Sequence, residues 1–308
     1  MKLDFVIVTF SRDFNLLKLQ ARSFCRYVPY DLIESIIIIC KDDQIHVDRI
    51  AEIKPEFGYL QDKVKIYNAD IICNNWRDYY HGWFAQQIIK LRVYKVCTAK
   101  YHIIFDTKNH FIRNIDDTYF FKNNKPLQVI ENYTNSVMKE YIINTFNYFQ
   151  KLKNPSIAFE NYYKDCTSIP HFQTLLTPVI FITDICKEID TKYNICDIIN
   201  DKENTAEFAL YGCYLIYNNL QNLYETTYKQ FSLTIYNLND FNNLNNLHEY
   251  SILGISADLF SKINDSIYEK TLLKEIWLSY KLCNKDESEK IITYMSYVTA
   301  KSWSILIF

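Results

Sequence analysis

The sequence contains little glycine, with four glycines among 308 residues. Glycine-rich phosphate loops, such as the Walker A motif and Gly-x-Gly-x-x-Gly, need several glycines close together because backbone amides must approach the phosphates. Neither motif is present, and the Gly-x-Ser-x-Gly motif of many serine hydrolases is also missing. A nucleotidyltransferase with a glycine-rich loop and a serine hydrolase of this type are therefore disfavoured.

Strong charge and long apolar runs are also missing. The 34 basic and 36 acidic residues leave a formal net charge of −2, whereas proteins that bind nucleic acid through bulk charge need a basic surface. No run reaches the roughly 18 apolar residues that span a membrane, and residues 1–10 lack a signal-peptide cleavage site. We expect a cytoplasmic protein with no nucleic-acid partner and no transmembrane segment, for which peripheral membrane contact stays open.

The nine cysteines include no Cys-x-x-Cys pair. That spacing would be expected of a zinc ribbon or a thioredoxin-like redox site. An odd number of scattered cysteines is typical of reduced thiols in the cytosol, which agrees with the location expected above.

Hydrophobic residues make up 49% of the chain, enough for a sizeable core. Early in the chain, short apolar runs alternate with segments of helical periodicity, which is the pattern of a parallel α/β sheet. With no internal repeat and no Pro/Gly-rich linker, residues 1–308 are predicted to form a single domain. We predict strands at 3–10, 35–40, 64–67, 101–105, 126–130, 177–182 and 231–236. We predict helices at 14–27, 83–97, 136–152, 155–163, 184–189, 206–219, 274–282 and 288–301.

The stretch from Tyr101 to Asn114 is the most informative part of the chain. A buried strand over 101–105 ends abruptly in the polar segment Asp106–Asn109, which has no reason to lie in a core. Ligands of open α/β sheets bind just beyond the carboxyl ends of the strands. Asp106–Asn109 is therefore a candidate functional segment, although an ordinary polar turn explains the same pattern equally well.

Two predicted helices carry polar residues on one face. Gln86, Gln87 and Lys90 lie at positions i, i+1 and i+4, so Gln86 and Lys90 share a face, as do Glu207 and Tyr211. Periodicity alone indicates a solvated face for the first group. For Glu207 it indicates a first-turn glutamate that the helix dipole favours.

Four stretches resemble GT-A-fold glycosyltransferases, in particular the uncharacterised DUF6492-type family of bacterial and viral transferases: Phe5–Asp13, Trp83–Lys90, Phe105–Arg113 and Ala206–Gly212. The resemblance implies a GT-A-like, Rossmann-type α/β fold with a mostly parallel central sheet flanked by helices. It implies a nucleotide-sugar-binding half at 1–130 and an acceptor-side half at 131–308 with closing C-terminal helices. The implied reaction moves a sugar from a nucleotide-sugar, most commonly a UDP-sugar, to a glycan, glycolipid or glycoprotein, as in polysaccharide biosynthesis.

The resemblance also assigns residues to the nucleotide-sugar. Those at the first strand would line the nucleotide pocket, and the others would face the donor sugar or its phosphates. For Asp13 the alternative is an N-cap of the helix that begins at residue 14, because Asp favours that position. The residues concerned are Thr9, Phe10, Asp13, Gln86, Gln87, Lys90, Asp106, Asn109 and Arg113.

The sequence departs from this fold's usual Asp-x-Asp motif, which holds a divalent cation against the diphosphate. Here the motif reads Asp106-Thr107-Lys108. A positioned ammonium can stabilise a leaving diphosphate, as a metal ion does. We therefore expect Lys108, together with Lys90, Arg92 or Arg113, to take over part or all of the metal's role in catalysis.

A Mn²⁺ or Mg²⁺ cofactor stays open at this stage. Asp106 could be a lone carboxylate ligand, with Asn109 or His110 as further ligands and phosphate oxygens completing the shell. Without a metal, the reaction would need no cofactor beyond the nucleotide-sugar donor.

An inverting transferase needs a general base beside the acceptor hydroxyl. We expect Glu207 to be this base, with His171 and Tyr211 on the acceptor side and with Asp184 or His171 as other candidates for the base. A retaining outcome stays open because these spacings do not report stereochemistry. The alternative function is a non-catalytic nucleotide- or sugar-binding module on a GT-A fold, in which Lys108 marks lost metal chemistry.

Overall fold

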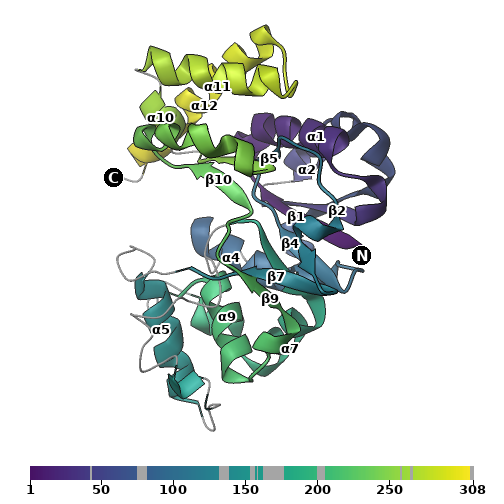
Figure 1. Cartoon of the computed structure of the whole chain (residues 1–308), viewed down its shortest axis with the longest axis vertical. Coiled ribbons are helices and arrows are strands. Elements are labelled where there is room, and N and C mark those ends of the chain that lie inside the picture. The colour runs from purple at the N-terminus through teal and green to yellow at the C-terminus, as the bar shows by residue number, and fades with distance from the viewer. Residues whose placement is uncertain are drawn as a thin grey trace.

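A five-stranded sheet with the order β3-β2-β1-β4-β8 lies at the centre of the fold (Figure 1). The first four of these strands run parallel, and β8 pairs antiparallel with β4. The predicted mostly parallel sheet is therefore confirmed, with one antiparallel edge strand. The sheet consists of β1 (Leu3–Thr9), β2 (Ile33–Cys40), β3 (Val64–Asn68), β4 (Tyr101–Ile104) and β8 (Val179–Ile182). The computed structural model describes residues 1–41, 44–74, 82–131, 139–152, 157, 159–161, 177–199, 205–256, 259–263 and 266–305.

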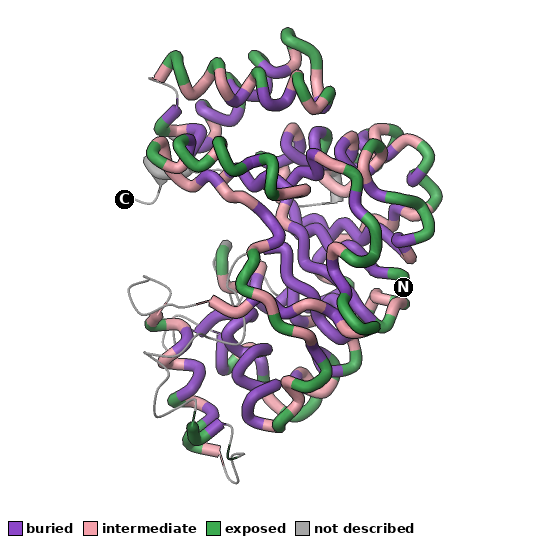
Figure 2. The backbone as a smooth tube through the Cα atoms, viewed as in Figure 1, coloured by how far each residue is buried: buried purple, intermediate pink, exposed green. Residues whose placement is uncertain are grey.

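Continuous apolar runs explain the central strands. β1 is buried along its whole length, and in register Val6 lies beside Ile37 of β2 and Ile104 of β4. Such runs form strands whose two faces are both covered. Figure 2 shows the buried backbone concentrated in these strands.

Helices flank the sheet. Phe24 of α1 packs edge-on against Phe5 of β1, with ring centroids 5.1 Å apart. α9 contacts α4, α5 and α7 and is buried along its whole length, as a helix that is apolar on all sides should be. The predicted helix at 155–163 lies mostly outside the described residues. The helices of this part are α1 (Phe14–Tyr27), α2 (Gln44–Ala51), α4 (Gly82–Arg92), α5 (Lys139–Gln150), α7 (Thr183–Lys192), α8 (Ile195–Ile198) and α9 (Glu207–Tyr217).

Two three-stranded sheets, β10-β11-β5 and β6-β7-β9, complete the β structure. β5 pairs antiparallel with β11, which places Asn109 beside Gly254. The prediction that Asp106–Asn109 lies outside the core is therefore wrong for Thr107 and Asn109, which are 5% and 0% exposed. The strands are β5 (Asn109–Phe111), β6 (Phe121–Lys122), β7 (Lys125–Val129), β9 (Glu225–Thr227), β10 (Ser232–Ile235) and β11 (Ile252–Ile255).

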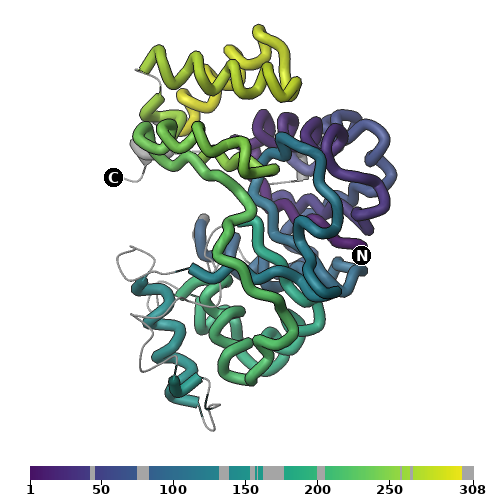
Figure 3. The backbone as a smooth tube through the Cα atoms, viewed as in Figure 1, coloured from purple at the N-terminus to yellow at the C-terminus, as the bar shows by residue number. Residues whose placement is uncertain are grey.

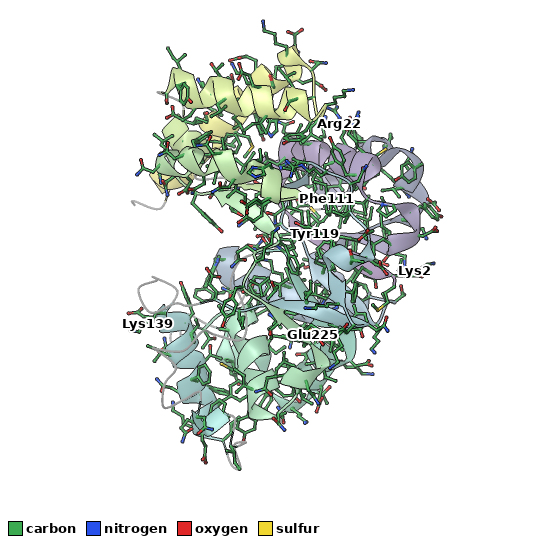
Figure 4. The ribbon with its side chains drawn as sticks, viewed as in Figure 1. Lys2, Arg22, Phe111, Tyr119, Lys139 and Glu225 are labelled. Carbon is green, nitrogen blue, oxygen red and sulfur yellow. The ribbon has the colours of Figure 1, made fainter. Side chains whose placement is uncertain are left out.

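The C-terminal helices lie beside α1, so segments from the beginning and the end of the sequence pack together (Figure 3). Leu16 of α1 belongs to the same apolar cluster as Trp277. Arg22, labelled in Figure 4, donates hydrogen bonds to Glu56 Oε2 at 2.8 Å and to Glu287 Oε1 at 2.9 Å. No helix among the described residues is both long and apolar enough to cross a membrane. These helices are α10 (Leu259–Ile263), α11 (Ile267–Ser279) and α12 (Lys285–Ile305).

Two buried histidines should make the fold sensitive to acid. His102 Nδ1 lies 3.0 Å from Thr183 Oγ1, and His110 Nε2 lies 3.3 Å from the Leu16 carbonyl oxygen. Burial lowers the pKa of His102 to about 3, and burial outweighs the hydrogen bonds of His110 and lowers its pKa to about 4. Both side chains therefore stay neutral at pH values where histidines of the unfolded chain take up a proton.

Below about pH 6.5 the unfolded state binds more protons than the folded state, so the free energy of unfolding should fall as the pH falls. Each histidine should contribute about 1.4 kcal/mol per pH unit. The contribution of His110 should end near pH 4, and that of His102 near pH 3. Urea denaturation at pH 7, 6 and 5 measures this slope, which His102→Gln should reduce. An unchanged slope in that variant would contradict the prediction.

Candidate active site

The turn after β4 presents Asp106 and Lys108 at the carboxyl edge of the sheet. The Asn109 N–H donates to the Asp106 carbonyl at 2.9 Å, which closes a four-residue turn. From α1, the side-chain amide of Gln20 donates to the carbonyl oxygens of Asp106 and Asn109, at 2.7 and 2.9 Å. The backbone of the turn is held at both ends, so its two charged side chains extend from a fixed base.

Four charged side chains from three segments meet here, and we refer to them as the Lys90 cluster. Lys90 Nζ, on α4, lies 3.0 Å from Asp106 Oδ1 and 3.2 Å from Oε1 of Glu207, the first residue of α9. Lys108 Nζ lies 3.4 Å from Asp106 Oδ2. The side chains of Lys90 and Glu207 are 7% and 5% exposed, whereas those of Asp106 and Lys108 are 18% and 24% exposed. The cluster is thus closed around Lys90 and opens to solvent at Lys108.

Neutral side chains surround the cluster. The Thr177 hydroxyl, just before β8, donates to Asp106 Oδ2 at 3.0 Å and accepts from Asn109 Nδ2 at 2.9 Å. Gln87 Oε1 accepts from the backbone N–H of Glu207 at 2.9 Å, which satisfies one of the unpaired amides at the start of α9. Gln87 Nε2 is buried without a hydrogen-bond partner among the described residues. An acceptor oxygen of a ligand would remove the cost of this unmet donor.

The two carboxylates differ in their pKa. Burial raises the pKa of Glu207, and the nearby Lys90 ammonium only partly offsets this. Burial acts in the same direction on Asp106, but Lys90 and Lys108 outweigh it and hold the pKa of that carboxyl well below its usual range. For Lys90, the two carboxylates outweigh burial and raise its pKa. Asp106 is therefore a permanent anion at neutral pH, and Glu207 is the acid of the pair that exchanges a proton more readily.

A second group of residues follows β1 and β2. Thr9 is buried at the end of β1, and the ring of Phe10 comes next. Lys41 Nζ lies 4.6 Å from the centroid of that ring, and the Arg12 guanidinium carbon lies 5.4 Å from it, both within cation–π range. The Lys41 N–H donates to the Thr9 carbonyl at 3.1 Å. Because β1, β2 and β4 are parallel neighbours, this group lies at the same edge of the sheet as Asp106.

The structure does not bring the two arginines proposed as additional cations into the Lys90 cluster. Arg92 Nε donates to Asp190 Oδ1 at 2.9 Å. The guanidinium of Arg113 donates to the backbone carbonyls of His248 and Tyr250. Both arginines therefore hold separate segments of the chain together, which departs from the roles expected for them.

Tyr211, a candidate for the acceptor side, and Asp184, a candidate for the general base, also lie elsewhere. Tyr211 is fully buried, and its hydroxyl accepts from the Ile182 N–H at 2.9 Å and lies 2.6 Å from Tyr224 Oη. It belongs to the core between α9 and the sheet. Asp184 is exposed in the first turn of α7, directly after β8. Since β8 runs antiparallel to β4, Asp184 lies at the opposite edge of the sheet from Asp106.

Lys90 lies near a different glutamine from the one predicted, Asp13 has only part of its alternative role, and His171 is outside the described residues. Gln87, three residues before Lys90 on α4, contacts the backbone of Glu207 beside the Lys90 cluster, whereas the prediction placed the half-buried Gln86 on the face of Lys90. Asp13 occupies the N-cap position of α1, but its side chain makes no capping hydrogen bond. Asp13 therefore has the position of an N-cap residue, as the alternative predicted, but not the hydrogen bond of one.

The sequence did not point to four residues of this site. Tyr236 follows β10, and its ring centroid lies 5.6 Å from Lys108 Nζ. Tyr236 and Lys41 each come at the end of a predicted strand, and this was a usable signal. Thr177 and Gln20 act through contacts with distant parts of the chain, which local sequence does not show.

The family of the chain follows from its sequence match. Residues 2–252, more than half of the chain, match the DUF6492 family, described as a family of unknown function. The chain belongs to the DUF6492 family. No curated protein sequence matches it.

Solved structures that resemble this DUF6492 protein are glycosyltransferases. The galactosyltransferase LgtC, in complex with donor and acceptor sugar analogs, is 8% identical, with a TM-score of 0.50 over 92% of this chain and 98% of LgtC. An active-site mutant of LgtC gives a TM-score of 0.52. GlyE of Streptococcus pneumoniae TIGR4 is 12% identical, with a TM-score of 0.48 over 95% of this chain, which spans only 62% of GlyE. The likeness to LgtC concerns the fold, which is that of GT-A glycosyltransferases.

Proposed function

We propose that this DUF6492 protein is a glycosyltransferase that moves a sugar from a nucleotide-sugar, most commonly a UDP-sugar in this fold, to a glycan, glycolipid or glycoprotein acceptor. The Lys90 cluster carries the proposal, because two carboxylates with pKa values shifted in opposite directions lie at the carboxyl edge of a GT-A sheet. Environments that separate the pKa values of neighbouring groups are typical of acid–base sites.

The donor would lie along this edge, with its nucleotide at the end of β1 and its sugar at the Lys90 cluster. Phe10 offers a ring face on which a base can stack, and Lys41 brings positive charge to the same place. The Asp13 carboxylate, which lies 3.6 Å from the Arg12 guanidinium, would accept a hydrogen bond from the base or the ribose. Asp106 and Nε2 of Gln87, which has no hydrogen-bond partner among the described residues, would bind sugar hydroxyls, which both accept and donate hydrogen bonds.

Glu207 is the proposed general base of an inverting transfer. It removes the proton of the acceptor hydroxyl while that oxygen forms a bond to the anomeric carbon. The bond from the anomeric carbon to the diphosphate oxygen breaks, and its electron pair leaves with the diphosphate. A raised pKa brings the basicity of Glu207 closer to the working pH, which favours general-base catalysis.

A non-catalytic nucleotide- or sugar-binding module is the second candidate. The observation that favours it is that both oxygens of Asp106 already face an ammonium group, from Lys90 and from Lys108. A carboxylate paired in this way is stable without any reaction. The two candidates differ in one observable property, which is whether the nucleotide-sugar is consumed.

A thermal-shift panel combined with a turnover assay tests the proposal. A nucleotide-sugar that binds only the folded state stabilises it by RT ln(1 + [L]/Kd), about 2.7 kcal/mol at one hundred times Kd. We expect one class among UDP-, GDP- and ADP-sugars to raise the melting temperature and to release its nucleoside diphosphate slowly without an acceptor. Stabilisation without any release would favour the binding module. No stabilisation by any member of the panel would contradict both candidates.

A further inference from the structure

The divalent cation that a GT-A fold usually holds does not fit the residues present at this site. A hard cation needs carboxylate oxygens that can be turned towards it. Both oxygens of Asp106 already lie in ion pairs, Oδ1 with Lys90 at 3.0 Å and Oδ2 with Lys108 at 3.4 Å. Oδ2 also accepts a hydrogen bond from the Thr177 hydroxyl at 3.0 Å, whereas Oδ1 has no hydrogen-bond partner among the described residues besides this ion pair. Within the described part of the chain, no group of three or more His, Cys, Asp or Glu residues could hold a metal ion.

The neighbouring polar side chains, Asn109 and His110, do not supply the missing metal ligands. Nδ2 of Asn109 donates a hydrogen bond to the Thr177 hydroxyl. Oδ1 of Asn109 faces Gly254 of β11 so closely that a Cβ atom on Gly254 would lie 2.8 Å from this oxygen. His110 is fully buried with Nε2 against the Leu16 carbonyl. A metal at Asp106 would therefore have to displace a lysine and approach without a second protein ligand from this turn.

The charge of the site makes a metal unnecessary. The four side chains of the Lys90 cluster, two lysines and two carboxylates, sum to no net charge, and two carboxylates that hold a divalent cation also sum to none. The two ammonium groups thus offer a diphosphate at least as much positive charge as a metal-loaded Asp-x-Asp motif. Fixed cations act on a developing phosphate charge in the same way as a metal, because both are preorganised.

Building on the proposed function, we infer that Lys108 binds the diphosphate of the donor directly and that the site needs no divalent cation. The two lysines have different roles in this inference. Lys90 is 7% exposed and bridges two carboxylates, so it is fixed in place. Lys108 is 24% exposed, makes the longer contact to Asp106, and lies over Tyr236, so it can turn outward to a phosphate while Lys90 keeps Asp106 ionised.

Isothermal titration calorimetry of the 308-residue chain tests the role of Lys108 and the need for a metal. UDP, GDP and ADP are each titrated once in EDTA and once in Mn²⁺. The nucleotide that binds should show the same Kd in both buffers. Lys108→Ala should weaken its binding roughly tenfold to a hundredfold, the usual range for a lost hydrogen bond to a charged group. The same variant should leave binding of the matching nucleoside, which has no phosphate, unchanged.

The matched control is Lys229→Ala, because Lys229 also lies over a tyrosine ring, that of Tyr250 at 5.8 Å, and is exposed. It should leave the Kd unchanged. Binding that appears only with Mn²⁺ would overturn this inference and leave the proposed function standing. An unchanged Kd in Lys108→Ala would overturn the role of Lys108. Failure of every nucleotide and nucleotide-sugar to bind in both buffers would instead overturn the proposed function, and this inference with it.

Discussion

Replacing Glu207 by glutamine should reduce the rate of sugar transfer by about 10²–10⁴-fold, the range that general acid–base catalysis contributes. The amide has the size of the carboxylate and still offers an oxygen to Lys90, now 3.2 Å from Glu207 Oε1. It cannot accept a proton from the acceptor. Donor binding should therefore stay within a few fold of that of the parent protein, so that kcat falls while the Kd of the nucleotide-sugar is kept.

The pH dependence of the rate gives a second readout for Glu207. Because burial raises its pKa, the rate of the parent protein should fall as the pH decreases through a value above 4.5, the ordinary value for glutamate. Above that pH the base is ionised and the rate should level off. The acid limb should be absent from the residual activity of Glu207→Gln. A variant that keeps more than a tenth of the rate, with the same acid limb, would contradict the assignment.

The matched control is Glu188→Gln on α7. Glu188 also contacts a lysine, Lys192, but this pair lies on the surface, with side chains 43% and 48% exposed. The Glu188→Gln substitution should leave kcat and the Kd of the donor unchanged. A similar loss of rate in both variants would indicate a general effect of removing negative charge.

The long, periodic elements of this fold are the ones that the sequence predicts well. α1 begins at Phe14 and ends at Tyr27, as predicted, because apolar residues repeat along its buried face over almost four turns. β5 and β11 were missed because strands of three and four residues show too little alternation. β5 pairs with β11 across a large separation in sequence, and β11 also pairs with β10. α11 begins at Ile267, seven residues before its predicted start, because Ile267 is exposed and the start of this helix has no apolar periodicity.

In the candidate site, too, local sequence predicts individual residues but not the contacts between distant segments. Asp106 and Lys108 were candidates because they follow a predicted strand, and Lys90 and Glu207 were candidates because of the resemblance to GT-A glycosyltransferases. Their meeting depends on how α4 and α9 approach the sheet, which no local pattern reports. Gln86 and Gln87 were both candidates, and the prediction placed Gln86 on the face of Lys90, whereas Gln87, about 100° away around the helix axis, contacts Glu207.

The roles expected for Arg92, Arg113 and Tyr211 depend on distant partners in the same way. Local sequence shows that a charge or a hydroxyl is present, but not what will neutralise or bury it. Arg92 contacts Asp190, and Tyr211 contacts Tyr224, both from later segments of the chain.

Lys90→Met should lower the free energy of unfolding by about 3–5 kcal/mol, the usual cost of removing one partner of a buried ion pair. Methionine fills a similar volume, so the cost comes from charge and not from a cavity. It leaves Glu207 buried without a counter-ion and Asp106 with Lys108 alone. Urea denaturation at pH 7 measures the change. The control, Lys192→Met, removes the exposed partner of Glu188 and should cost less than about 1 kcal/mol.

The double variant Lys90→Met, Glu207→Gln separates a bridging role of Lys90 from simple packing. An unpaired amide costs less to bury than an unpaired carboxylate, so the second change should restore part of the stability that the first removes. The two changes should then deviate from additivity by more than about 1 kcal/mol, as expected for residues in one network. If the two costs add, Lys90 and Glu207 are not coupled, and the cluster is no more than a set of neighbouring charges. Restored stability with no transfer activity would show that the same charges serve both the fold and the reaction.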